Sequence, residues 1–316
     1  MFTLEDKFSI VRWSFILLSI VYITRVAVEY MRNNGVPLLL KLASIPLVFG
    51  MASFADMYWI EPNWIKTEWV VIKDQALASV LAGIKVLQIS DIHIGNSIGY
   101  RERQLIEKVN ELNPDILFIT GDFFSIKYGP DAAAQLKAIS HLISSLKASV
   151  GIFGILGNYD GYLSHNPARL REMKRAGIEI LVNESRRILL PNGQVLWLTG
   201  LHETSGDQNK GNMISIYGAL EMVPDNSPTI LLNHYPDIFD KAIKAGVNLV
   251  LAGHTHGGQI GIPFLIHMSN SANKSPYMRG LFDAGKTKMY VNRGIGTTNI
   301  PVRYLCRPEI TVFEVV

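Results

Sequence analysis

Short runs of apolar residues, separated by stretches with helical spacing, fill the chain from residue 84 onward. Eight of these runs are predicted strands: 84–90, 115–120, 151–156, 195–200, 229–234, 249–253, 289–294 and 310–315. Several are continuously apolar rather than alternating, as expected for strands buried on both faces. Four stretches between them have the spacing of helices: 101–112, 132–147, 167–176 and 236–245. Strands that alternate with helices predict an α/β fold.

Two apolar stretches near the N-terminus differ from this pattern. The first, 8–28, is interrupted by two arginines, and the second, 36–60, carries one lysine and one aspartate. Their charge-free cores are shorter than the about 20 apolar residues of a transmembrane helix. We expect a membrane-embedded hairpin or an interfacial anchor, with a pair of amphipathic helices packed on the protein as the alternative. A cleavable signal peptide is not indicated, because Glu5 and Asp6 disrupt its basic start.

Composition and charge exclude some classes of function and of binding site. The chain is 48% hydrophobic and 18% charged, with a formal net charge of +3. This mild positive excess suits an anionic ligand but lacks the clustered lysines and arginines of a nucleic-acid footprint. The single cysteine, Cys306, excludes an intrachain disulfide and a zinc-ribbon site. We expect an N-terminal helical anchor over 1–62, a linker over 63–83 and a catalytic domain over 84–316.

Residues of metal-binding type follow the predicted strands at their carboxyl ends. Seven such residues occur: Asp91, His93, Asp122, Asn158, His234, His254 and His256. Each alone has an ordinary explanation as a turn residue or a structural histidine. In an open α/β sheet, however, ligands bind at the carboxyl ends of the strands. Seven donors at the same edge are better explained by one shared metal site than by seven unrelated structural roles.

The donor types indicate the chemistry of this site. Two carboxylates, one amide oxygen and four imidazoles suit manganese, iron or zinc better than calcium, which prefers oxygen ligands. Seven ligands are too many for one tetrahedral zinc ion, but they suit two metals that share a carboxylate. Two metals about 3.5–4 Å apart can hold a bridging hydroxide and clamp a phosphoryl oxygen. The sequence therefore predicts two divalent transition metals of open identity and a phosphate-containing substrate.

The motifs "DIH", "GD", "GNYD", "NH" and "GHTH", in this order, resemble the signature of the calcineurin-like metallophosphoesterases over about residues 83–316. The segments "EPNWIKTEW" and "VNRGIGTTNIPVRYLCRPEI" resemble the membrane-anchored branch of that family. The resemblance implies a four-layer α/β/β/α sandwich with the two metals at its edge. It assigns the first metal to Asp91, His93, Asp122 and His256. It makes Asp122 the bridge and completes the second metal with Asn158, His234 and His254.

One position departs from the family pattern. The family usually reads Gly-Asn-His-Asp, where the histidine contacts the phosphate and can protonate the leaving group, but here the residue is Tyr159. The next residue, Asp160, usually orients its neighbour in that family. A phenol, with a reference pKa of about 10, transfers a proton less readily than an imidazole. We expect a preference for pyrophosphates or other good leaving groups. The alternative is that Tyr159 only fills space while His202 or an arginine takes over.

Together these features predict a membrane-associated dimetal phosphohydrolase, located at a bacterial inner or plasma membrane. The expected substrate is a phosphoester or a pyrophosphate, and a lipid-linked, UDP-diacylglucosamine-like molecule fits the pairing of anchor and site. A general phosphodiesterase or phosphatase on soluble substrates is the alternative. A non-enzymatic metal-bound scaffold is a third hypothesis, which the complete ligand set disfavours. Arg279 and Arg293 are weaker candidates for clamping phosphate.

Overall fold

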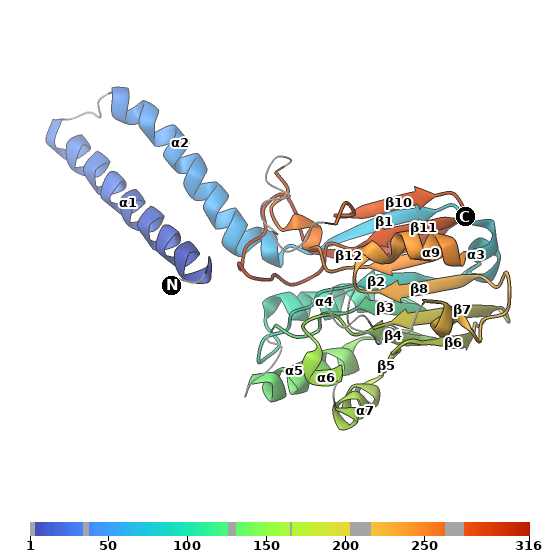
Figure 1. Ribbon diagram of the computed structural model, residues 1–316. Helices are drawn as coiled ribbons and strands as arrows, with labels where there is room; N and C mark the ends of the chain where they lie inside the picture. The colour runs from blue at the N-terminus through green and yellow to red at the C-terminus, as the bar shows by residue number, and fades with distance from the viewer. Residues whose placement is uncertain (1–3, 34–37, 126–130, 165, 203–215, 263–274) are drawn as a thin grey trace.

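Two six-stranded sheets form the body of the computed structural model, within the described residues 4–33, 38–125, 131–164, 166–202, 216–262 and 275–316 (Figure 1). The strands are β1 (Lys66–Ile72), β2 (Val86–Ile89), β3 (Ile116–Thr120), β4 (Gly151–Ile155), β5 (Ile178–Ile180), β6 (Glu184–Leu189), β7 (Val195–Leu201), β8 (Thr229–Asn233), β9 (Leu249–Ala252), β10 (Gly280–Ala284), β11 (Thr287–Val291) and β12 (Glu309–Val315). The first sheet has the order β1-β12-β2-β3-β4-β5, and the second β10-β11-β9-β8-β7-β6. Both sheets are mixed, but β2-β3-β4 and β7-β8-β9 are parallel throughout.

The eight expected strands and the four expected helices are all confirmed. The helices of the sandwich are α3 (Gln75–Val80), α4 (Tyr100–Leu112), α5 (Asp131–Ser145), α6 (Gly161–Ser164), α7 (Pro167–Ala176), α8 (Ile216–Leu220) and α9 (Phe239–Ala245), with short turns η3 (Pro236–Ile238) and η4 (His256–Gly258). The pattern of apolar residues missed β1, β5, β6 and β10. Each of these strands lies at an edge of its sheet and mixes polar or charged residues with apolar ones, so its apolar residues stand out less.

Three apolar cores separate four layers of the sandwich. Leu117 of β3 packs with α4, α5 and α7 on the outer face of the first sheet. Its neighbour Phe118 points the other way and packs between the two sheets, in the same cluster as Leu232 of β8. Leu231, also on β8, faces α9 on the outer side of the second sheet. Because side chains alternate along a strand, each central strand serves two cores, which explains its uninterrupted apolar sequence.

Residues 63–83, expected as a linker, contribute a strand and a helix to the sandwich. β1 pairs in parallel with β12 along its full length, from Lys66 to Ile72. α3 begins at the N-cap Asp74, whose side chain accepts a hydrogen bond from the main-chain N–H of Leu77 at 2.9 Å. Ile72 and Leu77 are buried between the two sheets. The division of the chain into anchor, linker and catalytic domain stays a prediction.

The N-terminal part consists of α1 (Leu4–Asn33) and α2 (Leu38–Ala55), which form a hairpin that projects from one end of the sandwich (Figure 1). α2 continues through the short turns η1 (Asp56–Ile60) and η2 (Glu61–Asn63) into β1. Many apolar side chains of the hairpin are exposed, Leu18 at 67% and Phe49 at 70% among them. Among the helices in the described ranges, none combines the length and apolar character that a membrane crossing requires.

Ile72→Ala is expected to lower the free energy of unfolding by about 2–5 kcal/mol, because it leaves a cavity between the two sheets. The neighbouring Val71 is 44% exposed, whereas Ile72 is fully buried. Val71→Ala is therefore the matched control, with an expected change within about 0.5 kcal/mol. Urea unfolding followed by circular dichroism measures both. Equal, small effects would show that β1 is not an integral part of the core.

Candidate metal centre

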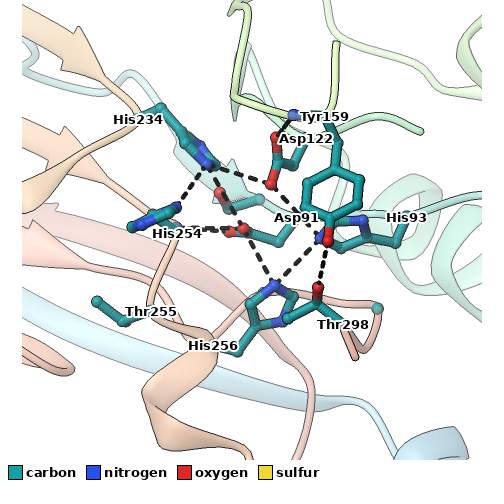
Figure 2. Close-up of polar contacts among 12 residues, drawn as sticks. Asp91, His93, Asp122, Tyr159, His234, His254, Thr255, His256 and Thr298 are labelled. Atoms are coloured by element: carbon teal, nitrogen blue, oxygen red, sulfur yellow. Dashed lines mark hydrogen bonds and ion pairs between the residues drawn. The ribbon is translucent and has the colours of Figure 1, made fainter. Parts of the chain in front are cut away.

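All seven predicted ligands lie together at the carboxyl ends of central strands of the two sheets, and Figure 2 labels six of them. Six of them form two clusters whose ligand atoms lie within 4.8 Å of one another: Asp91, His93 and His256 in the first, and Asp122, His234 and His254 in the second. Asn158, which follows β4, joins the second cluster, because its Oδ1 lies 3.1 Å from Nε2 of His234. The structure thus brings together donors that are far apart in the sequence.

Asp122 lies between the two clusters. Its Oδ2 is 3.3 Å from Nε2 of His234 in the second cluster and 3.5 Å from Nε2 of His93 in the first. Its other oxygen, Oδ1, accepts a hydrogen bond of 2.7 Å from the main-chain N–H of Tyr159. One carboxylate oxygen is therefore fixed by the main chain while the other faces both groups of donors.

The backbone turns sharply at most of these ligands. Five of them have a positive φ: Asp91 (49°), His93 (45°), Asp122 (55°), His254 (71°) and His256 (52°). A left-handed conformation is uncommon for residues with a side chain and costs on the order of 1–3 kcal/mol. It is tolerated here because buried strands fix the backbone on one side of each turn. The turns bring donors from neighbouring strands toward one point.

Hydrogen bonds to main-chain carbonyls set the orientation of two histidine rings. Nδ1 of His93 lies 2.8 Å from the carbonyl oxygen of Phe124, and Nδ1 of His234 lies 2.7 Å from that of Thr120. In the neutral ring, Nδ1 then carries the hydrogen and Nε2 carries a lone pair. The lone pair of His93 faces Nε2 of His256 at 3.1 Å, and that of His234 faces an amide oxygen. Acceptors that face one another across a buried space fit a bound cation, so the donor set fits metal ions.

Burial and charge shift the pKa values of these groups in opposite directions. Burial lowers the pKa of His93, and burial together with the charge of His93 lowers the pKa of His256. Burial would also lower the pKa of His234, but the carboxylates of Asp122 and Asp91 outweigh it and raise this pKa to about 10. Burial raises the pKa of Asp91, whereas the effect of burial on the pKa of Asp122 is outweighed by His234, which lowers it. Because metal ligands are deprotonated, a metal bound by His234 would displace the proton that this raised pKa favours.

Asp160 is fully buried and holds the main chain under Asp122. Its Oδ2 accepts from the N–H groups of Asp122 and Gly157, each at 2.8 Å. Its Oδ1 accepts from the N–H groups of Phe123 at 2.8 Å and Phe124 at 3.3 Å. Burial and the charge of Asp122 raise the pKa of Asp160 to about 8, against the lowering effect of the hydrogen bonds from Gly157 and Phe123. The carboxylate joins the loop after β3 to the loop after β4.

Arg303 is a fully buried residue whose role no sequence motif indicated. Its guanidinium donates to the carbonyl oxygens of Arg293, Gly294, Gly296 and Cys306. The segment it holds is tied to the first cluster, because the N–H of Gly296 donates to the carbonyl oxygen of Asp91 at 2.7 Å. Arg293, a candidate for clamping phosphate, instead pairs with Glu309 and, at 2.9 Å, with Glu68. Arginine–carbonyl contacts of this kind leave no signature in a single sequence.

Several known proteins are similar to this chain in sequence. A family model described as calcineurin-like phosphoesterase matches residues 84–258. The metallophosphoesterase YkuE of Bacillus subtilis (strain 168) is 33% identical over 257 residues, which cover 81% of this chain and 87% of YkuE. Phosphodiesterase YaeI of Escherichia coli (strain K12) is 28% identical over 271 residues, covering 84% of this chain and 93% of YaeI. A Danio rerio protein named transmembrane protein with metallophosphoesterase domain is 29% identical over 283 residues, covering 87% of this chain and 61% of that protein.

In the metal-stripped protein, the free energy of unfolding is expected to fall as the pH rises from about 6.5, the reference pKa of histidine, toward 10. His234 has a folded-state pKa of about 10, so the stabilisation from its protonation is complete below the unfolded pKa, falls as the pH rises above that value and is lost at about pH 10. The expected slope is about 1 kcal/mol per pH unit, measured by urea unfolding in the presence of a chelator.

His234→Gln should flatten this slope, and the exposed His141→Gln is the matched control that should leave it unchanged. A slope that is the same in wild type and His234→Gln would contradict the assignment of the proton to His234.

Proposed function

The chain belongs to the calcineurin-like phosphoesterase family, and from this premise we propose that it is a membrane-associated phosphohydrolase whose substrate is a lipid-linked pyrophosphate. Membership in the family makes it a phosphoester hydrolase that uses two divalent metals. The observation that carries the proposal is the pair of buried donor clusters around Asp122, at one end of a sandwich that also bears an exposed apolar hairpin.

We assign the ligands as two sets that share one residue. The first set is Asp91, His93, Asp122 and His256, and the second is Asp122, Asn158, His234 and His254. The position of Asp122 Oδ2, within 3.5 Å of a donor of each cluster, supports its role as the bridge. When bound, two divalent metals act as Lewis acids on the phosphoryl group and on the attacking water. The main-chain bonds of His93 and His234 keep their Nε2 atoms aimed into the site.

Tyr159 and Asp160 follow Asn158 in the chain and act in different ways. Asp160 is a positioning residue, because its four main-chain contacts fix the loop that carries Asp122. The Tyr159 ring stands edge-on to His93, with ring centroids 4.8 Å apart, which places it over the first cluster. Its hydroxyl is able to donate a hydrogen bond to a phosphate oxygen. Such a donor stabilises a departing anion but is a weaker proton source than imidazole, so pyrophosphates suit it better than alkyl esters.

The N-terminal hairpin supports the membrane part of the proposal. Exposed apolar side chains on α1 and α2 offer a surface that lipid would cover. The end of this region is joined to the site end of the sandwich: the carboxylate of Glu61 accepts from the N–H groups of Leu305, at 2.7 Å, and Cys306. The name of the Danio rerio relative, a transmembrane protein, also favours it. A phosphodiesterase acting on soluble substrates is the second candidate, and the name of the Escherichia coli relative favours phosphodiester hydrolysis.

Asp122→Ala is expected to lower the hydrolysis of bis(p-nitrophenyl) phosphate by about 100-fold or more, because it removes the proposed shared ligand. Metal analysis should show about two transition-metal ions per wild-type chain and fewer in the variant. Asp225→Ala, at an exposed turn residue, is the control and should change neither quantity. Full metal content together with full activity in Asp122→Ala would reject the assignment.

A nucleotide-diphosphate lipid is expected to be hydrolysed faster than an alkyl phosphodiester lipid of equal chain length, because its leaving group departs as a stable anion. Mass spectrometry of the lipid extract measures both products. A faster reaction with the alkyl ester would contradict the proposal.

The double variant Leu17→Ser/Leu18→Ser separates the membrane contribution from the chemistry. Both side chains are exposed, at 63% and 67%, and lie on α1, which projects away from the sandwich. This variant should lose turnover of the lipid in vesicles while keeping that of the soluble chromogenic diester. Turnover of both substrates at the wild-type rate would argue for the soluble-substrate alternative.

A further inference from the structure

A loop from the C-terminal part of the chain contacts the proposed site beside Tyr159 (Figure 2). The side-chain hydroxyl of Thr298 donates a hydrogen bond to the Tyr159 hydroxyl oxygen, with 3.1 Å between the two oxygens. Thr298 is half-buried and is separated from Tyr159 by 139 residues in sequence. A phenol that accepts this bond still carries its own hydrogen, which it can donate to a further oxygen.

The main chain of Thr298 is held at both of its polar groups by one side chain. Oε1 of Gln259 accepts from the N–H of Thr298 at 2.7 Å, and Nε2 of Gln259 donates to its carbonyl oxygen at 3.1 Å. Gln259 is 4% exposed, has a positive φ of 56° and lies shortly after His256 in the chain. A side-chain amide supplies both the donor and the acceptor that this clamp needs, whereas a carboxylate has no hydrogen to give.

The same loop is also fixed against the first ligand cluster. The N–H of Ile295 donates to the carbonyl oxygen of Ser90 at 2.9 Å, and the N–H of Gly296 to that of Asp91 at 2.7 Å. The buried guanidinium of Arg303 binds the carbonyl oxygen of Gly296 at 2.6 Å. Thr298 is therefore held relative to the segments that carry Asp91 and His256, and not only to the surface of the protein.

We propose that Thr298, clamped by Gln259, is a positioning residue that holds the Tyr159 hydroxyl where it donates a hydrogen bond to an oxygen of the bound phosphoryl substrate. Tyr159 is fixed at its other end by its N–H bond to Asp122, and its ring rests on His93. The hydrogen bond from Thr298 then fixes the position of the Tyr159 hydroxyl, which the other contacts leave free to move. Donation into the phenol oxygen also polarises its O–H and strengthens the bond that it gives. The inference rests on the proposed phosphohydrolase function.

The test is a double-mutant cycle on the metal-loaded, full-length protein. Thr298→Val and Tyr159→Phe should each lower kcat/KM for bis(p-nitrophenyl) phosphate by about 5–10-fold, the effect of one hydrogen bond. The double variant should be no worse than Tyr159→Phe, because both changes remove the same bond to substrate. Thr298→Ser, which keeps the hydroxyl, should restore the wild-type value.

Binding of inorganic phosphate, followed by calorimetry, gives a readout other than turnover. Its affinity should weaken by about the same 5–10-fold in Thr298→Val and Tyr159→Phe, with metal content and Tm unchanged. Thr297→Val is the matched control, since it makes the same chemical change at the adjacent half-buried position. Thr298→Ala replaces Thr298→Val should the β-branched variant fold poorly.

The outcomes separate the two proposals. A wild-type protein that hydrolyses no phosphoester would reject the proposed function, and the inference with it. An active wild type, with Thr298→Val indistinguishable from Thr297→Val, would reject the positioning role alone. Losses from Thr298→Val and Tyr159→Phe that add fully in the double variant would also reject it, because the two side chains would then act independently.

Discussion

Two carboxylates and four imidazoles crowd into a buried space where the two sheets meet, and the surrounding structure compensates for that crowding. Asp91 and Asp122 are almost fully buried, and an isolated buried carboxylate is strongly unfavourable. The imidazoles offset part of this charge, most of all His234, whose pKa the carboxylates raise to about 10. Bound metal ions would complete the compensation, because they would satisfy lone pairs that otherwise face one another. The loops after β2, β3, β8 and β9 carry these donors, so their conformation has to satisfy the charges and lone pairs gathered there.

Two buried side chains hold these loops by hydrogen bonds to the main chain. Asp160 gathers four N–H groups around Asp122, and Arg303 gathers carbonyl oxygens from the loop that lies against Asp91. One acidic and one basic side chain thus bond to main-chain groups that have left the regular pairing of the strands near the metal centre. Glycines give the space for this: a Cβ on Gly121 would lie 2.8 Å from both the Gly157 nitrogen and Nδ1 of His234. Tight main-chain packing is thus part of the construction of the site.

The ligands could be predicted from the sequence because two local signals coincide. Buried parallel strands such as β3 and β8 are continuous apolar runs, and a polar donor directly after such a run stands out. The supporting residues have no such signal. Thr298 and Gln259 contact each other across 39 residues, and Arg303 binds carbonyl oxygens that every residue possesses. β6 and β10 are edge strands that expose polar side chains, so their sequences resemble loops.

The N-terminal region and the metal centre share one stretch of chain, 303–307. On one side, the N–H of Arg303 donates to the carbonyl oxygen of Met57 at 3.1 Å, and the guanidinium of Arg307 stacks on Trp64 at 3.7 Å from the ring centroid. On the other side, Sγ of Cys306 lies 3.4 Å from the carbonyl oxygen of His256. Contacts from the end of the apolar hairpin therefore reach a ligand-bearing turn through a single loop.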